Sequence, residues 1–213
     1  SESMTSCILP ASITSLGAAA FSGCVSLQKI NIPKGVSTLN LETFYGCKSI
    51  TEVTIPNTVM RISYASTTWA SSGSGALNAS STFPCFAHCS SLKTVIFEDG
   101  DRPISFIDTT PGFSTPTGVL YANEIFYGCP ITSVYLGRTL EDSPGKGLFQ
   151  NFSTLTEVKI GSYVKGIQNY AFLNCKGIST INIPSNVTKI GDTSFRNCTN
   201  LTTVFIGDGI TTL

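Results

Sequence analysis

Charged residues are scarce in this chain, at 12% of its 213 residues, and thirteen basic side chains are balanced by thirteen acidic ones. Without a net charge, the chain produces no long-range field that would attract nucleic acid or an anionic membrane surface. Long apolar runs are also lacking, since none approaches the roughly 20 residues that a membrane-spanning helix requires. We therefore expect no nucleic-acid partner and no insertion of this segment into a membrane.

A secretion signal is missing from the first residues as well. The N-terminus, SESMTSCILP, has no basic stretch followed by an apolar core. These residues predict no signal peptide, which does not exclude export, because such a signal can be trimmed off. The chain is long enough for one sizeable domain with its own core, and we expect a single domain over residues 1–213.

Histidine is nearly absent. The single copy, His88, lies in CFAHCSSL, with Cys89 beside it and Cys85 three residues before it. This spacing raises two chemical hypotheses, a metal corner and a thiol–imidazole catalytic pair, but a lone histidine lacks the converging partners that both need. The sequence also shows no recurring close pair of carboxylates and no Gly-rich loop leading into a long helix. We therefore expect no catalytic residue, no metal and no cofactor.

What the chain has in abundance is repetition. Phenylalanine recurs at intervals of 23, 42, 40, 23, 23 and 23 residues, at Phe21, Phe44, Phe86, Phe126, Phe149, Phe172 and Phe195. The two long intervals equal one 23-residue repeat plus insertions of 19 and 17 residues. A fixed period of this kind indicates a stacked repeat protein, in which neighbouring repeats complete one another's core.

Each repeat carries the pattern of a half-buried strand. In FLNCKGISTINIPSNVTKI, which starts at Phe172, Ile181 and Ile183 alternate with the polar residues Thr180 and Asn182. Alternation with a period of two places the isoleucines in the core and the polar residues on the surface. With one strand per turn, the strands must run parallel. They are expected to begin near Cys7, Ile30, Val53, Val95, Val134, Val158, Ile181 and Val204.

The repeat L-x-x-[IV]-x-[IL]-P-x-x-V-x-x-I, followed by A/S-F-x-x-C, resembles the BspA-like leucine-rich repeats of bacterial and protist surface proteins. The resemblance covers nearly the whole chain, in about eight turns. It implies a leucine-rich-repeat solenoid, a right-handed superhelix of 23-residue units with one parallel strand per turn and short helical or turn segments between strands. It also implies surface adhesion to host matrix proteins such as fibronectin and fibrinogen.

One position of the repeat explains His88. The residue just before the shared cysteine position is, copy by copy, Gly23, Gly46, His88, Gly128, Asn151, Asn174 and Asn197. These residue types enter the left-handed backbone region at the lowest cost. We call this the turn position and interpret His88 as a backbone residue of it, with no chemical role.

The cysteines follow the same logic. One repeat position holds Cys24, Cys47, Cys89, Cys129, Cys175 and Cys198. The remaining copy has Phe152 there, so the position is apolar and buried, and Cys7 and Cys85 also align with apolar residues of other copies. Parallel Cβ vectors disfavour disulfides between turns, and the 23-residue interval keeps four thiols from surrounding one zinc ion. We predict that all eight cysteines are small core hydrophobes.

Two insertions interrupt the repeats, near residues 63–81 and 108–121, with a short extension near 99–101. Both insertions follow the second inward position of their repeat, so the two loops should emerge side by side on one edge. They are rich in Ser, Thr, Gly and Pro, yet they carry the aromatic residues Tyr64, Trp69, Phe113 and Tyr121. These aromatics either fold back over a widened core or build a recognition edge, and the sequence leaves both readings open.

A second candidate surface is the column of outward strand residues, Ile8, Asn31, Thr54, Ile96, Tyr135, Lys159, Asn182 and Phe205. We expect Ile96, Tyr135 and Phe205 to bind ligand together with the loop aromatics. The resulting hypothesis is a non-enzymatic binding module, extracellular or at the cell surface, with a protein ligand and a glycan as the second option. A passive spacer, a polysaccharide-recognition module and an enzyme built on the inserted loops remain the alternatives.

Overall fold

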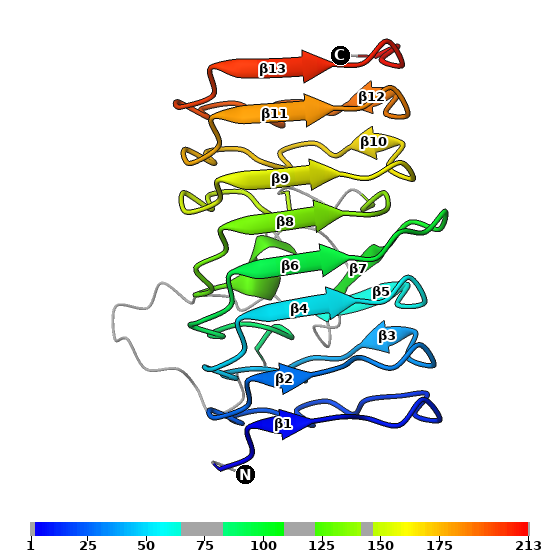
Figure 1. The fold of residues 1–213 in the computed structure, drawn as a ribbon, viewed down its shortest axis with the longest axis vertical. Coiled ribbons are helices and arrows are strands. Elements are labelled where there is room, and N and C mark those ends of the chain that lie inside the picture. Colours follow the sequence, from blue (N-terminus) through cyan, green and yellow to red (C-terminus); the bar gives the residue numbers. More distant parts are fainter. Residues whose placement is uncertain (1–2, 65–82, 109–121, 142–146, 213) are drawn as a thin grey trace.

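The computed structural model describes residues 3–64, 83–108, 122–141 and 147–212. The chain coils upward in successive turns, with strands running across the front of Figure 1 and the chain returning behind them. This sense of winding makes a right-handed solenoid, as the repeat pattern predicts. The two ends of the chain lie at opposite ends of the coil.

The front of each turn is a short parallel strand, and all eight expected strands are present. They are β1 (Ser6–Cys7), β2 (Lys29–Ile30), β4 (Glu52–Ile55), β6 (Thr94–Phe97), β8 (Ser133–Leu136), β9 (Glu157–Ile160), β11 (Thr180–Ile183) and β13 (Thr203–Ile206). β4, β6, β8 and β9 pair in register, so that Val53, Val95, Val134 and Val158 form one inward row. These valines are buried, as the alternation predicts.

The structure has a second set of strands, in addition to the predicted strand of each turn, that was not predicted. β3 (Thr38–Leu39), β5 (Arg61–Tyr64) and β7 (Ser105–Asp108) form a parallel ladder, and β10 (Gly166–Ile167) pairs with β12 (Lys189–Ile190). Three of these five strands have two residues, which is too short for an alternating pattern to show in the sequence. The one helix of the described residues, η1 (Ala122–Phe126), is too short to cross a membrane.

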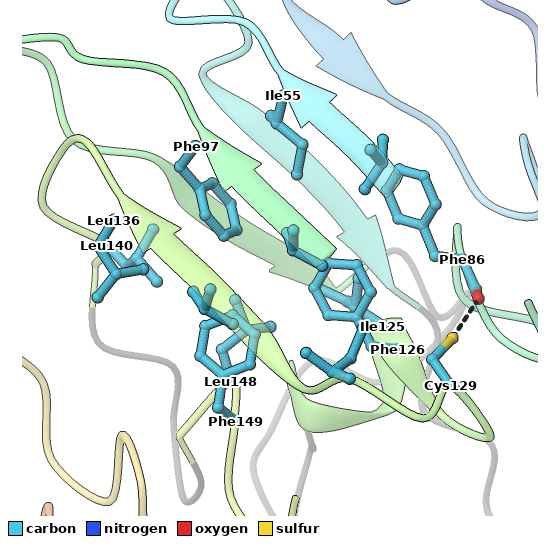
Figure 2. Packing of buried hydrophobic residues seen from close by; sticks show 14 of the residues in the cluster. Ile55, Phe86, Phe97, Ile125, Phe126, Cys129, Leu136, Leu140, Leu148 and Phe149 are labelled. Carbon is cyan, nitrogen blue, oxygen red and sulfur yellow. Dashed lines mark hydrogen bonds between the residues drawn. The ribbon is translucent and has the colours of Figure 1, made fainter. Parts of the chain in front are cut away.

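The core is organised around a stack of phenylalanine rings, one from each turn. Consecutive rings from Phe21 to Phe195 lie 5.1–6.1 Å apart between centroids and within 18° of parallel. Figure 2 shows Phe86, Phe126 and Phe149 of this stack among aliphatic side chains. The pairs on either side of Phe86 stack as closely as the regular copies, so the two insertions leave the pitch of the coil unchanged.

The backbone confirms the turn position. All seven of its residues have a positive φ, between 60° and 73°, and His88 is among them at 61°. A second left-handed residue, four positions earlier, occurs in four copies and was not predicted: Ala19, Glu42, Tyr170 and Thr193. None of these four is Gly or Asn, so the packing of the turn imposes a conformation that the residue type does not signal.

The cysteines are reduced, as predicted, and they have an additional role. All eight thiols are free, and all except the partly exposed Cys7 are buried. In five copies the thiol donates a hydrogen bond to the phenylalanine carbonyl of the preceding turn, at 2.9–3.1 Å between S and O. Figure 2 shows the bond from Cys129 to Phe86. Cysteine thus fills the core and also ties adjacent turns, which Phe152 in the same position cannot do.

We predict that the seven buried thiols of the native protein resist alkylation. Burial raises the pKa of Cys47 and of Cys175 to about 12, so the reactive thiolate is scarce near neutral pH. At about pH 8, iodoacetamide should label Cys7 in the native protein and all eight cysteines after unfolding in urea, as counted by mass spectrometry. Labelling of native Cys175 at the rate of Cys7 would contradict this prediction.

An arginine in place of Cys175 should strongly destabilise the fold, because it puts an unpaired charge into the cluster that holds Phe149 and Phe172. We expect the free energy of unfolding to fall by about 3–5 kcal/mol. Cys175→Ser is the matched control, since it keeps a donor for the Phe149 carbonyl, and should cost about 1–2 kcal/mol. Urea denaturation measures both losses, and equal losses would argue against a buried apolar position.

Candidate binding surfaces

The two insertions begin at the ends of neighbouring strands. β5 and β7 pair in parallel, with Tyr64 opposite Asp108 at their ends. The insertions therefore start side by side, as their equivalent places in the repeat indicate. Of the candidate loop residues, Trp69, Phe113 and Tyr121 lie outside the described residues, and Tyr64 is described only as the last residue of β5.

The outward column of strand residues separates into two parts. Ile96 on β6 lies opposite Tyr135 on β8, and both are half-buried. Phe205 on β13 is 59% exposed, and the column positions of Lys159 and Asn182 lie between it and Tyr135. Figure 1 places β13 at the end of the coil, well away from β6 and β8. The structure thus brings Ile96 and Tyr135 together and leaves Phe205 apart.

The short extension after β6 lies against Tyr135. The Tyr135 hydroxyl donates to Asp99 Oδ1 at 2.6 Å, and this hydrogen bond raises the pKa of Tyr135 to about 12. Asn57 donates through Nδ2 to the Asp99 carbonyl at 2.9 Å and through its backbone N–H to Glu98 Oε2 at 3.2 Å. Lys34 Nζ lies 3.7 Å from the same Glu98 oxygen. These bonds tie together the loops that follow β2, β4 and β6, beside a candidate contact residue.

Arg138, which follows β8, holds one of these loops, the one after β4, from the inside. Its side chain is fully buried, with Nη2 donating to the Pro56 carbonyl at 2.9 Å and Nη1 to the Asn57 carbonyl at 3.1 Å. Burial lowers its pKa to about 10, so the guanidinium stays charged at neutral pH. Sequence analysis missed Arg138 because other copies have exposed polar residues such as Ser162 at this position. The sequence feature that could have indicated a buried Arg138 is the extension after β6, because its Gly100 packs close to the Arg138 side chain.

His88 lies on the outer edge of its turn. Its ring meets the rings of Tyr45 and Tyr127 edge to face, at 5.7 and 5.3 Å between centroids. The Cys89 thiol donates to the Phe44 carbonyl, so it is engaged by the backbone and not by the imidazole. Within the described ranges, no three His, Cys, Asp or Glu side chains gather as a metal site would require. The backbone role of His88 was predicted, whereas its aromatic contacts were not.

An open groove of about 580 Å³ crosses the ladder of β3, β5 and β7. Its lining residues are Ser37, Thr38, Met60, Arg61, Asp101, Arg102, Pro103, Ser105 and Glu141. Two basic side chains balance two acidic ones in this lining, so the groove has no net charge that would select an anion or a cation.

Comparison with known proteins adds a family and a fold. Residues 1–99 and 121–213 match the model of the BspA type leucine rich repeat region, in six copies. The crystal structure of a leucine-rich repeat protein from Eubacterium ventriosum matches 92% of this chain at 25% identity, with a TM-score of 0.55. The match covers 43% of that protein, so this chain spans less than half of its length.

Two further solved structures are more distant. A leucine rich cell surface protein from Faecalibacterium prausnitzii is 22% identical, over 98% of this chain and 61% of that protein, with a TM-score of 0.37. A leucine-rich repeat protein from Bacteroides ovatus is 17% identical, over 99% of this chain and 75% of that protein, with a TM-score of 0.33. No curated protein matches the chain.

Arg138→Ala should destabilise the protein, because it removes the hydrogen bonds to the Pro56 and Asn57 carbonyls and leaves a cavity where the buried side chain lay. The expected loss is about 2–4 kcal/mol in the free energy of unfolding. Arg61→Ala, which removes an exposed arginine from β5, is the control and should change stability by less than about 0.5 kcal/mol. Thermal and urea denaturation measure the difference, and equal stability of the two variants would contradict a structural role for Arg138.

Proposed function

Because the chain belongs to the BspA-type leucine-rich-repeat family, we propose that it is a non-enzymatic binding module, secreted or held at the cell surface, that mediates adhesion through a protein ligand. Leucine-rich repeats generally mediate protein interactions, and a stacked solenoid offers an extended surface for them. The family is generally non-enzymatic. Host matrix proteins such as fibronectin and fibrinogen are the proposed partners, and residues 1–213 act as one domain in this proposal.

The observation that carries the proposal is the pairing of β5 with β7, which starts two irregular segments at adjacent points of an otherwise regular coil. Recognition residues concentrate on loops that a rigid scaffold positions. The two segments also hold the aromatic residues Tyr64, Trp69, Phe113 and Tyr121. Aromatic side chains give a large contact area for little lost rotamer freedom, which suits a neutral protein that has no charge to steer a partner.

The strand face contributes a second set of contacts in this proposal. Ile96 and Tyr135 are neighbours on adjacent strands, and the bond from Tyr135 to Asp99 fixes the phenol ring in one orientation. A side chain that is already ordered loses less conformational entropy on binding. Phe205 is a separate contact point, because it lies on β13 beyond Lys159 and Asn182.

Thiol chemistry is disfavoured by geometry. The Cys89 thiol beside His88 is buried and donates to the Phe44 carbonyl, and the neighbouring Cys129 thiol together with burial raises its pKa. A nucleophilic cysteine needs the opposite, an accessible thiol with a lowered pKa. This observation supports a binding role over an enzyme of the thiol–imidazole class.

The test is deletion of residues 66–80, replaced by a short Gly linker. The solenoid should remain folded, because the deleted residues lie outside the repeat positions and loop length affects stability only weakly. Binding to immobilised fibronectin or fibrinogen, measured by surface plasmon resonance, should fall at least about tenfold. Tyr163→Ser is the control, since it changes an exposed aromatic that is not among the proposed contacts and should leave affinity unchanged.

Three results would count against the proposal in different ways. A deletion variant that keeps both its stability and its affinity would move recognition to the strand face. An intact chain that binds neither matrix protein would remove these two partners and favour a passive spacer. A glycan array that shows binding while the matrix proteins do not would favour the polysaccharide-recognition alternative.

A further inference from the structure

The edge of the solenoid that carries the turn position has features that the proposed function does not use. This turn edge precedes the front strands and lies on the left in Figure 1. Along it, the turns that contain His88 and Gly128 carry a cluster of aromatic rings, and the following turns carry a row of amides in a groove. The two features adjoin, because the rings of Phe126 and Phe149 stack across the step between them.

The aromatic cluster consists of Tyr45, Phe83, His88 and Tyr127. Tyr45 stacks on Phe83 at 4.4 Å between centroids, and His88 stands edge-on between Tyr45 and Tyr127. Tyr127 is 48% exposed and His88 is exposed. Gly128 leaves room for the imidazole, since a Cβ at that residue would lie 3.1 Å from His88 Nδ1. The cluster is therefore an ordered aromatic surface that faces solvent.

The amide row consists of Asn151, Asn174 and Asn197. Asn174 Nδ2 donates to Asn151 Oδ1 at 2.7 Å, and Asn197 Nδ2 donates to Asn174 Oδ1 at 2.9 Å. The row forms one side of a groove of about 420 Å³, whose lining is completed by Ser153, Lys176 and Thr199. Amides, hydroxyls and one ammonium group line this groove. Equivalent groups on adjacent turns lie one strand apart, at roughly 4.8 Å.

Hydrogen bonds hold the amides of the row in place but do not use all of their donors and acceptors. A side-chain amide has two N–H donors and an oxygen with two lone pairs, and the row uses one donor and one acceptor site at Asn174. The bonds between the amides fix their orientation, so the remaining donors and acceptors lie at set positions. Preorganised polar groups of this kind bind a ligand at lower entropic cost than free side chains do.

The chemistry of the edge selects among ligands. A lining of amides and hydroxyls, in which Lys176 is the one charged group, suits a ligand that both donates and accepts hydrogen bonds and has no net charge. The backbone of the edge is already paired between turns, with the N–H groups of His88, Asn151 and Asn174 donating to carbonyls of the next turn. An extended peptide therefore cannot add to this edge as a strand. Ordered aromatic rings beside the groove provide a face on which the C–H side of a sugar ring can pack.

We propose that the turn edge binds a neutral, extended polysaccharide, with sugar rings packed on Tyr127 and His88 and hydroxyl groups bonded to the row of Asn151, Asn174 and Asn197. A polysaccharide is periodic along its length, as the turn edge is. Equivalent residues on successive turns can therefore contact successive sugars. The site lies on the turn edge, whereas the inserted segments begin at the ends of β5 and β7, and it goes beyond the adhesion proposed above.

The experiment titrates the intact chain with cellohexaose and with N-acetylchitohexaose, two neutral hexasaccharides, and with the corresponding disaccharides, by isothermal calorimetry. At least one hexasaccharide should bind, and more tightly than its disaccharide, because the edge offers contacts over several turns. Asn174→Gly removes one amide and keeps the left-handed backbone, since Gly fills the same position in other copies. It should weaken binding about 3- to 10-fold, and Tyr127→Ala should weaken it by a similar factor.

Tyr163→Ala is the matched control. Tyr163 is 46% exposed, almost as much as Tyr127, but it follows β9 and lies on the opposite edge of the coil. Its replacement should leave hexasaccharide affinity unchanged. Circular dichroism and the midpoint of thermal unfolding establish that each variant is folded. None of the three variants should alter binding to fibronectin or fibrinogen, so this proposal and the proposed function fail independently.

Several outcomes would overturn the proposal. One is the absence of binding by either hexasaccharide at millimolar concentration. Another is unchanged affinity in folded Asn174→Gly and Tyr127→Ala. A third is binding of an unfolded polypeptide, such as reduced and carboxymethylated casein, that these two variants weaken while no hexasaccharide binds, which would assign the edge to a protein partner.

Discussion

The structure depends on the requirement that successive turns stack in register. The phenylalanine rings express this in the core, because each packs on the ring of the next copy at 5.1–6.1 Å. A single repeat has no core of its own, so a turn of the wrong length would withdraw its ring and its strand from both neighbours. The chain meets the requirement by placing its two long insertions after β5 and β7, outside the repeat positions. Phe44, Phe86 and Phe126 accordingly stack across both insertions without a change of spacing.

The same requirement decides which features the sequence predicts. A side chain that recurs in every turn indicates its environment several times over, so the front strands, the phenylalanine stack and the left-handed turn position were predictable from the repeat. A backbone conformation that is imposed by closure of the turn is not indicated by any recurring residue type in the sequence. Ala19 and Thr193 adopt positive φ although their residue types do not favour it. Leu39 lies in a two-residue strand whose partner is a whole turn away, so no local pattern indicates it.

Contacts that join different turns are invisible to a pattern within one repeat. The partners of Arg138 are the carbonyls of Pro56 and Asn57, which lie 82 and 81 residues earlier in the chain. Burial of this guanidinium follows from an irregular extension, and the repeat alone would have left the position exposed, as it is at Ser162. His88 shows both cases at once. The repeat predicted its backbone conformation, while the rings around it belong to neighbouring turns.

The turn position also shows how a solenoid varies its surface without cost to the coil. The position requires a positive φ, which Gly supplies with no side chain at all, as Gly128 does. The backbone therefore does not demand the amides of Asn151 and Asn174 or the imidazole of His88. Because the position recurs on every turn along one edge, substitutions there add up to a continuous surface with the period of the coil. An insertion acts differently, since it adds residues at one point of the repeat and not on every turn. In the two proposals, the regular turn edge suits a partner that is itself periodic, and the insertions that begin at the ends of β5 and β7 suit a partner with a single contact area.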